Sequence, residues 1–242
     1  MLPVLEPYFS GPLKPYAQGV TLVTSTKNPT LDNFMQDPNG LMSSIQNFAL
    51  AQDVTKPRAQ ASIWHMHYTL RVLPSILACH SVLARALPLS LEAVYWDPQL
   101  QQLLLLHQGS LRSETETLDR YEELIFDHFA PLHLWLYKHF SIAPKVLWSN
   151  CAFRINHFLT TIESAIGPNT RLKYDKSTLL TQSKLGDRIN PLYKKPIIIN
   201  NHNNSYQLRN ECCFLHELPD KHYCNDCPKL SHHIEYYALK RR

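Results

Sequence analysis

An α+β fold is predicted for this chain of 242 residues, with a mostly helical body, a small β-hairpin and a cysteine-rich C-terminal segment. Three observations predict it. Apolar residues recur every three or four positions along most of the first 170 residues, which is the period of an amphipathic helix. That period is lost near residue 91, where short apolar runs flank a turn. Four of the six cysteines then fall within sixteen residues near the C-terminus.

Length and composition are those of a globular protein. Apolar residues make up 44% of the chain and charged residues 18%, which excludes disordered and fibrous classes. A chain of this length can fold as one domain. We therefore expect a helical body over residues 1–168, a connecting segment over 169–205 and a cysteine-bearing segment over 206–242 to pack as one domain.

The first quarter of the chain predicts an irregular start followed by helices. Residues 1–30 are rich in proline and polar residues and are expected to be irregular. A helical pattern runs from 31 to 52, and the Pro-Asn-Gly break at 38–40 should divide it into two helices. Helical spacing resumes over 58–86, where Pro74 is expected to kink or divide the helix.

The middle of the chain predicts a hairpin and two long helices. Residues 91–107 contain two short apolar runs around an Asp-Pro turn, which is typical of a β-hairpin. Helical spacing follows over 118–140, with a kink expected at Pro131. Another helix should begin near Pro144, where proline suits the first turn, and stop at Gly167.

Residues 168–205 contain few apolar positions and are expected to form a surface connection. One short helix is predicted near 178–186 and an extended piece at 197–199. No internal repeat with a period of 20–50 residues is present.

Charge is distributed unevenly along the chain. Residues 1–170 contain 11 Lys and Arg against 13 Asp and Glu, whereas residues 171–242 contain 13 against 7. Because no RNP-like, helix-turn-helix or two-Cys-two-His pattern accompanies the basic residues, no nucleic-acid partner is expected. The chain shows no secretory signal and no apolar run of about 18 residues, so a cytoplasmic protein without a transmembrane segment is predicted, and peripheral membrane association stays open.

The clustered cysteines are the most informative motif. Cys212, Cys213, Cys224 and Cys227 have the spacing C-C-x10-C-x2-C. A C-x2-C turn lets two thiolates converge on one metal atom. Adjacent side chains of a strand point to opposite faces, so Cys212 and Cys213 converge only if the backbone bends sharply. A two-iron centre relaxes that demand because it offers two metal atoms to four thiolates.

Other interpretations of these cysteines remain open. A zinc site is a poorer match to the spacing, although His216 or His222 could replace one thiolate. Disulfides would need an oxidising compartment. Cys79 and Cys151 lie on apolar helical faces and are predicted to be packed core cysteines.

The motif, with Arg209 ahead of it and Pro228 after it, resembles the terminal motif of the FhuF-like ferric-siderophore reductases. Weaker similarity extends upstream through Trp64-His65-Met66-His67-Tyr68, Arg71, the hairpin and Leu147-Trp148-Ser149-Asn150. The resemblance implies a [2Fe-2S] cluster held by Cys212, Cys213, Cys224 and Cys227, with no catalytic residue beyond the cluster.

The same resemblance implies one-electron reduction of siderophore-bound Fe(III) to Fe(II), which releases iron because hard oxygen ligands hold Fe(II) weakly. Since the sequence contains no nucleotide-binding motif, electrons should come from a separate ferredoxin or flavoprotein reductase. The alternative is a non-enzymatic, zinc-stabilised siderophore-binding or interaction module. His65 and His67 either line a substrate pocket or lie in a partly buried helix with satisfied hydrogen bonds.

Overall fold

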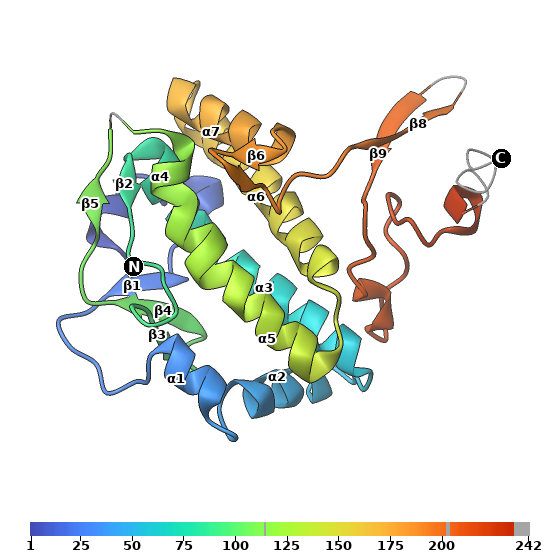
Figure 1. The fold of residues 1–242 in the computed structure, drawn as a ribbon, viewed down its shortest axis with the longest axis horizontal. Coiled ribbons are helices and arrows are strands. Elements are labelled where there is room, and N and C mark those ends of the chain that lie inside the picture. Colours follow the sequence, from blue (N-terminus) through green and yellow to red (C-terminus); the bar gives the residue numbers. More distant parts are fainter. Residues whose placement is uncertain (114, 202–203, 235–242) are drawn as a thin grey trace.

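The computed structural model describes residues 1–113, 115–201 and 204–234, so the last eight residues of the predicted segment 206–242 lie outside the described residues. The longest helices run side by side, with a three-stranded sheet at one side and a hairpin-bearing cysteine segment at the other (Figure 1). The predicted α+β class is confirmed. Among the described residues, no helix combines the length and apolarity that crossing a bilayer requires.

The N-terminal region contains two short 3-10 helices, Pro3–Leu5 and Gly11–Tyr16. The expected pair of helices follows as α1 (Leu31–Gln36) and α2 (Leu41–Leu50). Gly40 allows the break between them, because a Cβ atom at this position would lie 2.1 Å from the Phe34 carbonyl oxygen.

Helix α3 (Pro57–Leu77) begins with a proline, a residue that is common in the first turn because the N–H it lacks would have no partner within the helix there. Of the two effects expected at Pro74, a kink or a division of the helix, division does not occur. The helix continues through Pro74 and widens only at a π-helical turn, Ala78–Val82. Pro74 has no backbone N–H and therefore removes one hydrogen bond from the helix. Most of α3 is buried, so packing against neighbouring elements stabilises the helix at this point.

The predicted hairpin is confirmed as β3 (Tyr95–Asp97) and β4 (Gln102–Leu105), which are antiparallel. A third strand, β1 (Val20–Leu22), pairs in parallel with β4, so part of the region expected to be irregular is a strand. Two further short strands, β2 (Arg85–Ala86) and β5 (Ser110–Leu111), pair with each other.

The helix expected over 118–140 is interrupted differently from the prediction. It consists of α4 (Thr117–Glu122), a π-helical stretch (Glu123–Phe129) and α5 (Ala130–Phe140). Pro131 lies in the first turn of α5, where its missing N–H costs little.

Helix α6 (Pro144–Ile166) begins and ends as predicted, and Gly167 follows it with a positive φ of 86°. The short helix expected near 178–186 lies earlier, as α7 (Thr170–Thr181). Its buried face includes Asp175 and Thr178 and so gives little apolar periodicity. Two hairpins follow α7. The first pairs β6 (Lys184–Leu185) with β7 (Arg188–Ile189), and the second pairs β8 (Ile197–Asn201) with β9 (Asn204–Leu208).

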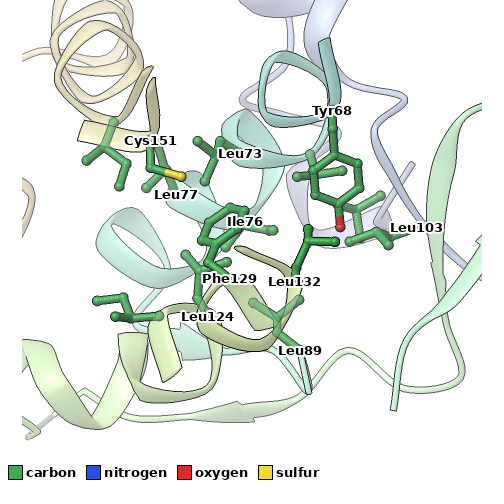
Figure 2. Packing of buried hydrophobic residues seen from close by; sticks show 14 of the residues in the cluster. Tyr68, Leu73, Ile76, Leu77, Leu89, Leu103, Leu124, Phe129, Leu132 and Cys151 are labelled. Atoms are coloured by element: carbon green, nitrogen blue, oxygen red, sulfur yellow. The ribbon is translucent and has the colours of Figure 1, made fainter. Parts of the chain in front are cut away.

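The core lies where α3, α5 and α6 pack against one another. Leu77, Phe129 and Leu132 are completely or almost completely buried there, and Figure 2 shows Cys151 beside them. Cys79 and Cys151 are both fully buried, as predicted for core cysteines.

A buried ion pair fastens α7 to this core. The Asp175 carboxylate lies 2.5 Å from Arg120 Nη2 and accepts hydrogen bonds from Ser81 and Thr117. Asp175→Ala should lower the free energy of unfolding by about 3–5 kcal/mol, because it leaves the Arg120 charge buried without its partner. Urea denaturation followed by circular dichroism measures this, and Asp187→Ala, at an exposed position, is the control. A loss below 1 kcal/mol for Asp175→Ala would contradict it.

Candidate functional site

An open cleft of about 830 Å³ lies between α6, α7 and the cysteine-bearing segment. Its volume is in the range of small-molecule sites, about 300–1,000 Å³. The cleft is lined by polar, cationic and aromatic side chains, among them Phe153, Asn156, Lys173, Lys176, Arg209 and Asp226. Because Asp226 lies between Cys224 and Cys227, the cleft adjoins the cysteine motif.

The backbone bends directly after the adjacent cysteine pair. Phe214 adopts a left-handed conformation, with φ at 62°, and a 3-10 turn over Leu215–Glu217 follows it. The C-x2-C turn is closed by a hydrogen bond of 2.9 Å from Cys227 N to Cys224 O. A second hydrogen bond, 3.0 Å from Arg209 N to Asp226 O, ties this turn to the end of β9.

The four thiols are brought together, but in a different pairing from the one expected for a C-x2-C turn. Cys227 Sγ lies 3.9 Å from Cys212 Sγ, and the Cys224 thiol neighbours that of Cys213. Over the residues that the structure describes, the four sulfur atoms do not form one set close enough to ligate a single ion. Cys224 and Cys227 thus each contact one member of the adjacent pair, and Cys224 also contributes to the raised pKa of Cys227.

Local surroundings keep the Cys224 and Cys227 thiols protonated in the absence of a metal. Burial raises the pKa of Cys227 to about 11, with a further contribution from Cys212. Burial, followed by repulsion from Cys213, raises the pKa of Cys224. Metal binding would have to displace these protons, as it does at thiolate sites in general. The imidazole of His216 lies beside one of the four thiols, with its Nδ1 3.7 Å from Cys212 Sγ.

A chain of buried polar groups docks the cysteine segment on the helical body. Ser62 Oγ of α3 donates a hydrogen bond of 2.8 Å to the Cys213 carbonyl. Asn150 Nδ2 of α6 donates to Ser62 Oγ at 3.2 Å, and Arg209 Nη2 donates to Asn150 Oδ1 at 3.0 Å. These contacts fix the carbonyl of one cysteine relative to both long helices.

Apolar and ionic contacts complete the docking. Phe214 and Leu218 pack on a small apolar cluster that includes Ala49 and Ile63. Two ion pairs lie at the edges: Lys56 with Glu217 at 2.8 Å, and Lys145 with Glu211 at 3.1 Å. Their lysines are largely exposed, so each pair contributes at most about 1 kcal/mol.

The polar chain can be tested at its middle residue. Asn150→Leu should lower the free energy of unfolding by about 1–3 kcal/mol, because it removes the donor to Ser62 Oγ and leaves Arg209 Nη2 without its acceptor. Limited trypsin digestion should also cut faster at Lys221 and Lys229. Asn156→Leu, at an exposed position of the same helix, should change neither. Equal digestion of the two variants would show that Asn150 does not hold the segment.

A second cluster lies in the core, outside the cleft. His65 of α3 and His133 of α5 face each other with their Nε2 atoms 2.9 Å apart, and Cys151 Sγ of α6 lies 3.8 and 3.9 Å from them. His67 instead points to Gln101 Oε1 at 2.7 Å. Neither His65 nor His67 lines the described cleft.

Burial dominates the ionisation of this cluster. It lowers the pKa of His65 to about 3, with a further contribution from the Arg154 charge, and holds the pKa of His133 well below its usual value. It raises the pKa of the Cys151 thiol well above its usual range. Both imidazoles are therefore neutral near pH 7, with lone pairs available as hydrogen-bond acceptors or metal ligands.

Sequence reasoning missed Ser62 and His133 entirely and treated Cys151 only as a packing residue. The sequence marked such residues only as polar positions on otherwise apolar helical faces. It did not reveal that His133 and Cys151, which lie 68 and 86 positions after His65, would meet it in the core.

Comparison with known proteins gives one informative similarity. No protein-family model matches the chain. Over 108 residues it is 27% identical to a protein of Escherichia coli (strain K12) named ferric siderophore reductase. The matched stretch covers 45% of this chain and 40% of that protein.

Proposed function

We propose that this protein reduces siderophore-bound Fe(III) to Fe(II) by one-electron transfer through a [2Fe-2S] cluster held by Cys212, Cys213, Cys224 and Cys227. The similarity to a ferric siderophore reductase supports the substrate class. The structural observation that carries the proposal is the position of two thiol pairs beside an open cleft.

The donor set supports a two-iron centre better than a single ion. Such a centre needs two thiolates at each of two irons, and Cys212 with Cys227 and Cys213 with Cys224 supply two separate pairs. A single zinc ion would need all four donors around one point. When bound, a cluster of this type supplies one electron at a time.

The cleft supports binding of a bulky iron chelate. Lys176 and Arg209 contribute positive charge, which would attract the anionic oxygens of hydroxamate or catecholate groups, whereas Lys173 is paired with Glu163 of the same cleft at 3.5 Å. The Arg209 guanidinium also lies 4.6 Å from the ring centre of Phe153, so this charge is held at the wall of the cleft. A chelate seated there would lie next to the C-x2-C turn.

The protein would bind the iron chelate and receive electrons through different parts of its surface. The cleft side chains hold and orient the chelate. The electron would come from a separate ferredoxin or flavoprotein reductase, in keeping with the absence of a nucleotide-binding motif from the sequence. Reduction weakens the complex because the hard oxygen donors prefer Fe(III).

The cofactor is tested by composition and colour. Protein purified without oxygen should show visible absorption that dithionite bleaches, with two irons and two acid-labile sulfides per chain. The alternative, a zinc-stabilised binding module, draws support from His216 as an extra donor beside Cys212. One zinc per chain with no labile sulfide would replace the reductase proposal by that alternative.

A further inference from the structure

The core cluster of His65, His133 and Cys151 has unmet polar groups. The three residues are 0%, 1% and 0% exposed. Without a metal, one hydrogen bond joins the two Nε2 atoms, and both Nδ1 atoms are buried with no hydrogen-bond partner among the described residues. Buried polar groups without partners are uncommon. The atoms that face one another, however, are the two Nε2 atoms and Cys151 Sγ, so these are the donors available to an ion.

The distances match those of a metal site. A point in the plane of the three atoms, about 2.0 Å from each Nε2, lies about 2.2 Å from Cys151 Sγ. These lengths agree with metal–imidazole and metal–thiolate bonds to within about 0.2 Å.

We propose that His65, His133 and Cys151 form a buried three-coordinate site for a soft transition-metal ion, and that Cu(I) is the ion it fits. This site is separate from the four C-terminal cysteines and does not depend on the reductase proposal. Within the described part of the chain, no fourth His, Cys, Asp or Glu joins the set. Two imidazoles and one thiolate are donors that soft ions prefer.

Charge favours a monovalent ion. The two neutral imidazoles and the Cys151 thiolate together carry one negative charge, which Cu(I) neutralises. A divalent ion would leave a net positive charge in the core, near the Arg154 guanidinium that already acts on His65. Burying an uncompensated charge is costly.

On binding, the Cys151 thiol releases its proton to solvent or buffer and its sulfur bonds to the metal. The imidazole that donates the Nε2–H···Nε2 hydrogen bond moves this proton to its own Nδ1, so both neutral rings bind the metal through Nε2 and their mutual hydrogen bond is lost. No change of oxidation state is involved. The bound ion would join α3, α5 and α6, so it should raise the melting temperature.

The test is a Cu(I) titration of the full chain in competition with bicinchoninate, without oxygen. The wild type should bind one more Cu(I) per chain than Cys151→Ser or His133→Gln, whatever the C-terminal cysteines bind. Cys79→Ser is the matched control, since Cys79 is equally buried but, among the described residues, belongs to no group of side chains close enough together to hold an ion. It should retain the extra ion.

Equal copper content in the wild type, Cys151→Ser and His133→Gln would overturn the site. If a variant fails to fold, X-ray absorption at the copper edge of the wild type decides, because a shell of sulfur alone excludes the two imidazoles. Zinc that fills the site and resists displacement by Cu(I) would overturn the choice of a monovalent ion.

Discussion

Replacing Cys224 by serine is expected to abolish siderophore-iron reduction and to remove most of the visible absorption. Serine offers a harder oxygen ligand, which would hold an iron of the proposed cluster weakly. The helical body should stay folded, because Cys224 is the most exposed of the four thiols and lies outside the main core. Binding of the ferric siderophore in the cleft should therefore persist.

The measurement is release of Fe(II) to ferrozine from a ferric siderophore with reductant supplied. Cys79→Ala is the control, since it removes a buried thiol far from the motif in sequence and should keep both colour and rate. Reduction by Cys224→Ser at the wild-type rate, above a control without protein, would contradict electron transfer through the cluster. Lost reduction with intact colour would also contradict it.

Acid is expected to destabilise the fold steeply through His80 and His128. Burial lowers the pKa of His80 to about 3 and that of His128 to about 4. In the unfolded chain both should titrate near 6.5. Below pH 6.5 the unfolded state thus binds more protons than the folded state, so stability present above pH 6.5 is lost as the pH falls toward 4.

The hydrogen bonds explain why these rings resist protonation. His80 Nε2 accepts from Leu87 N at 3.2 Å. His128 Nδ1 lies 2.7 Å from the Leu89 carbonyl, to which it donates, so its Nε2 is left to accept from the Tyr68 hydroxyl at 2.5 Å. If either Nε2 were protonated, its N–H would point at a group that is itself a donor, the Leu87 N–H for His80 or the Tyr68 hydroxyl for His128.

Between pH 6.5 and 4.5 these two histidines should together lower the free energy of unfolding by about 4 kcal/mol. Urea denaturation at several pH values measures the slope. His80→Leu should reduce that slope by about 1.4 kcal/mol per pH unit, whereas His107→Leu, at an exposed position, should leave it unchanged. A slope that His80→Leu does not alter would show that His80 is already protonated in the fold.

Local sequence patterns predicted the long helices well. Helix α6 follows from its apolar spacing, its N-terminal proline and Gly167. Strand β1 could not be predicted, because three residues carry little periodicity and their partner, β4, is distant in the chain. The π-helical turns escaped prediction as well, since one extra residue in a turn leaves the apolar pattern almost unchanged.

For the four C-terminal cysteines, the sequence predicted which residues form the candidate site but not how their thiols pair in space. The spacing of the cysteines predicts a metal-binding motif, but which thiols neighbour each other depends on the bend at Phe214 and on docking against α3 and α6. Those contacts join residues 151 positions apart. No local pattern encodes such a pairing.

The docking of Cys213 on Ser62 and Asn150 also orders events during synthesis. At about 5–20 residues per second, the ribosome completes both of these helical residues several seconds before it adds Cys213. The long helices can therefore pair while the thiols are still being made. Assembly of the proposed cluster would then act on a surface already prepared to receive the last segment. A shortage of iron would leave a folded body whose Cys224 and Cys227 thiols are protonated and therefore unreactive.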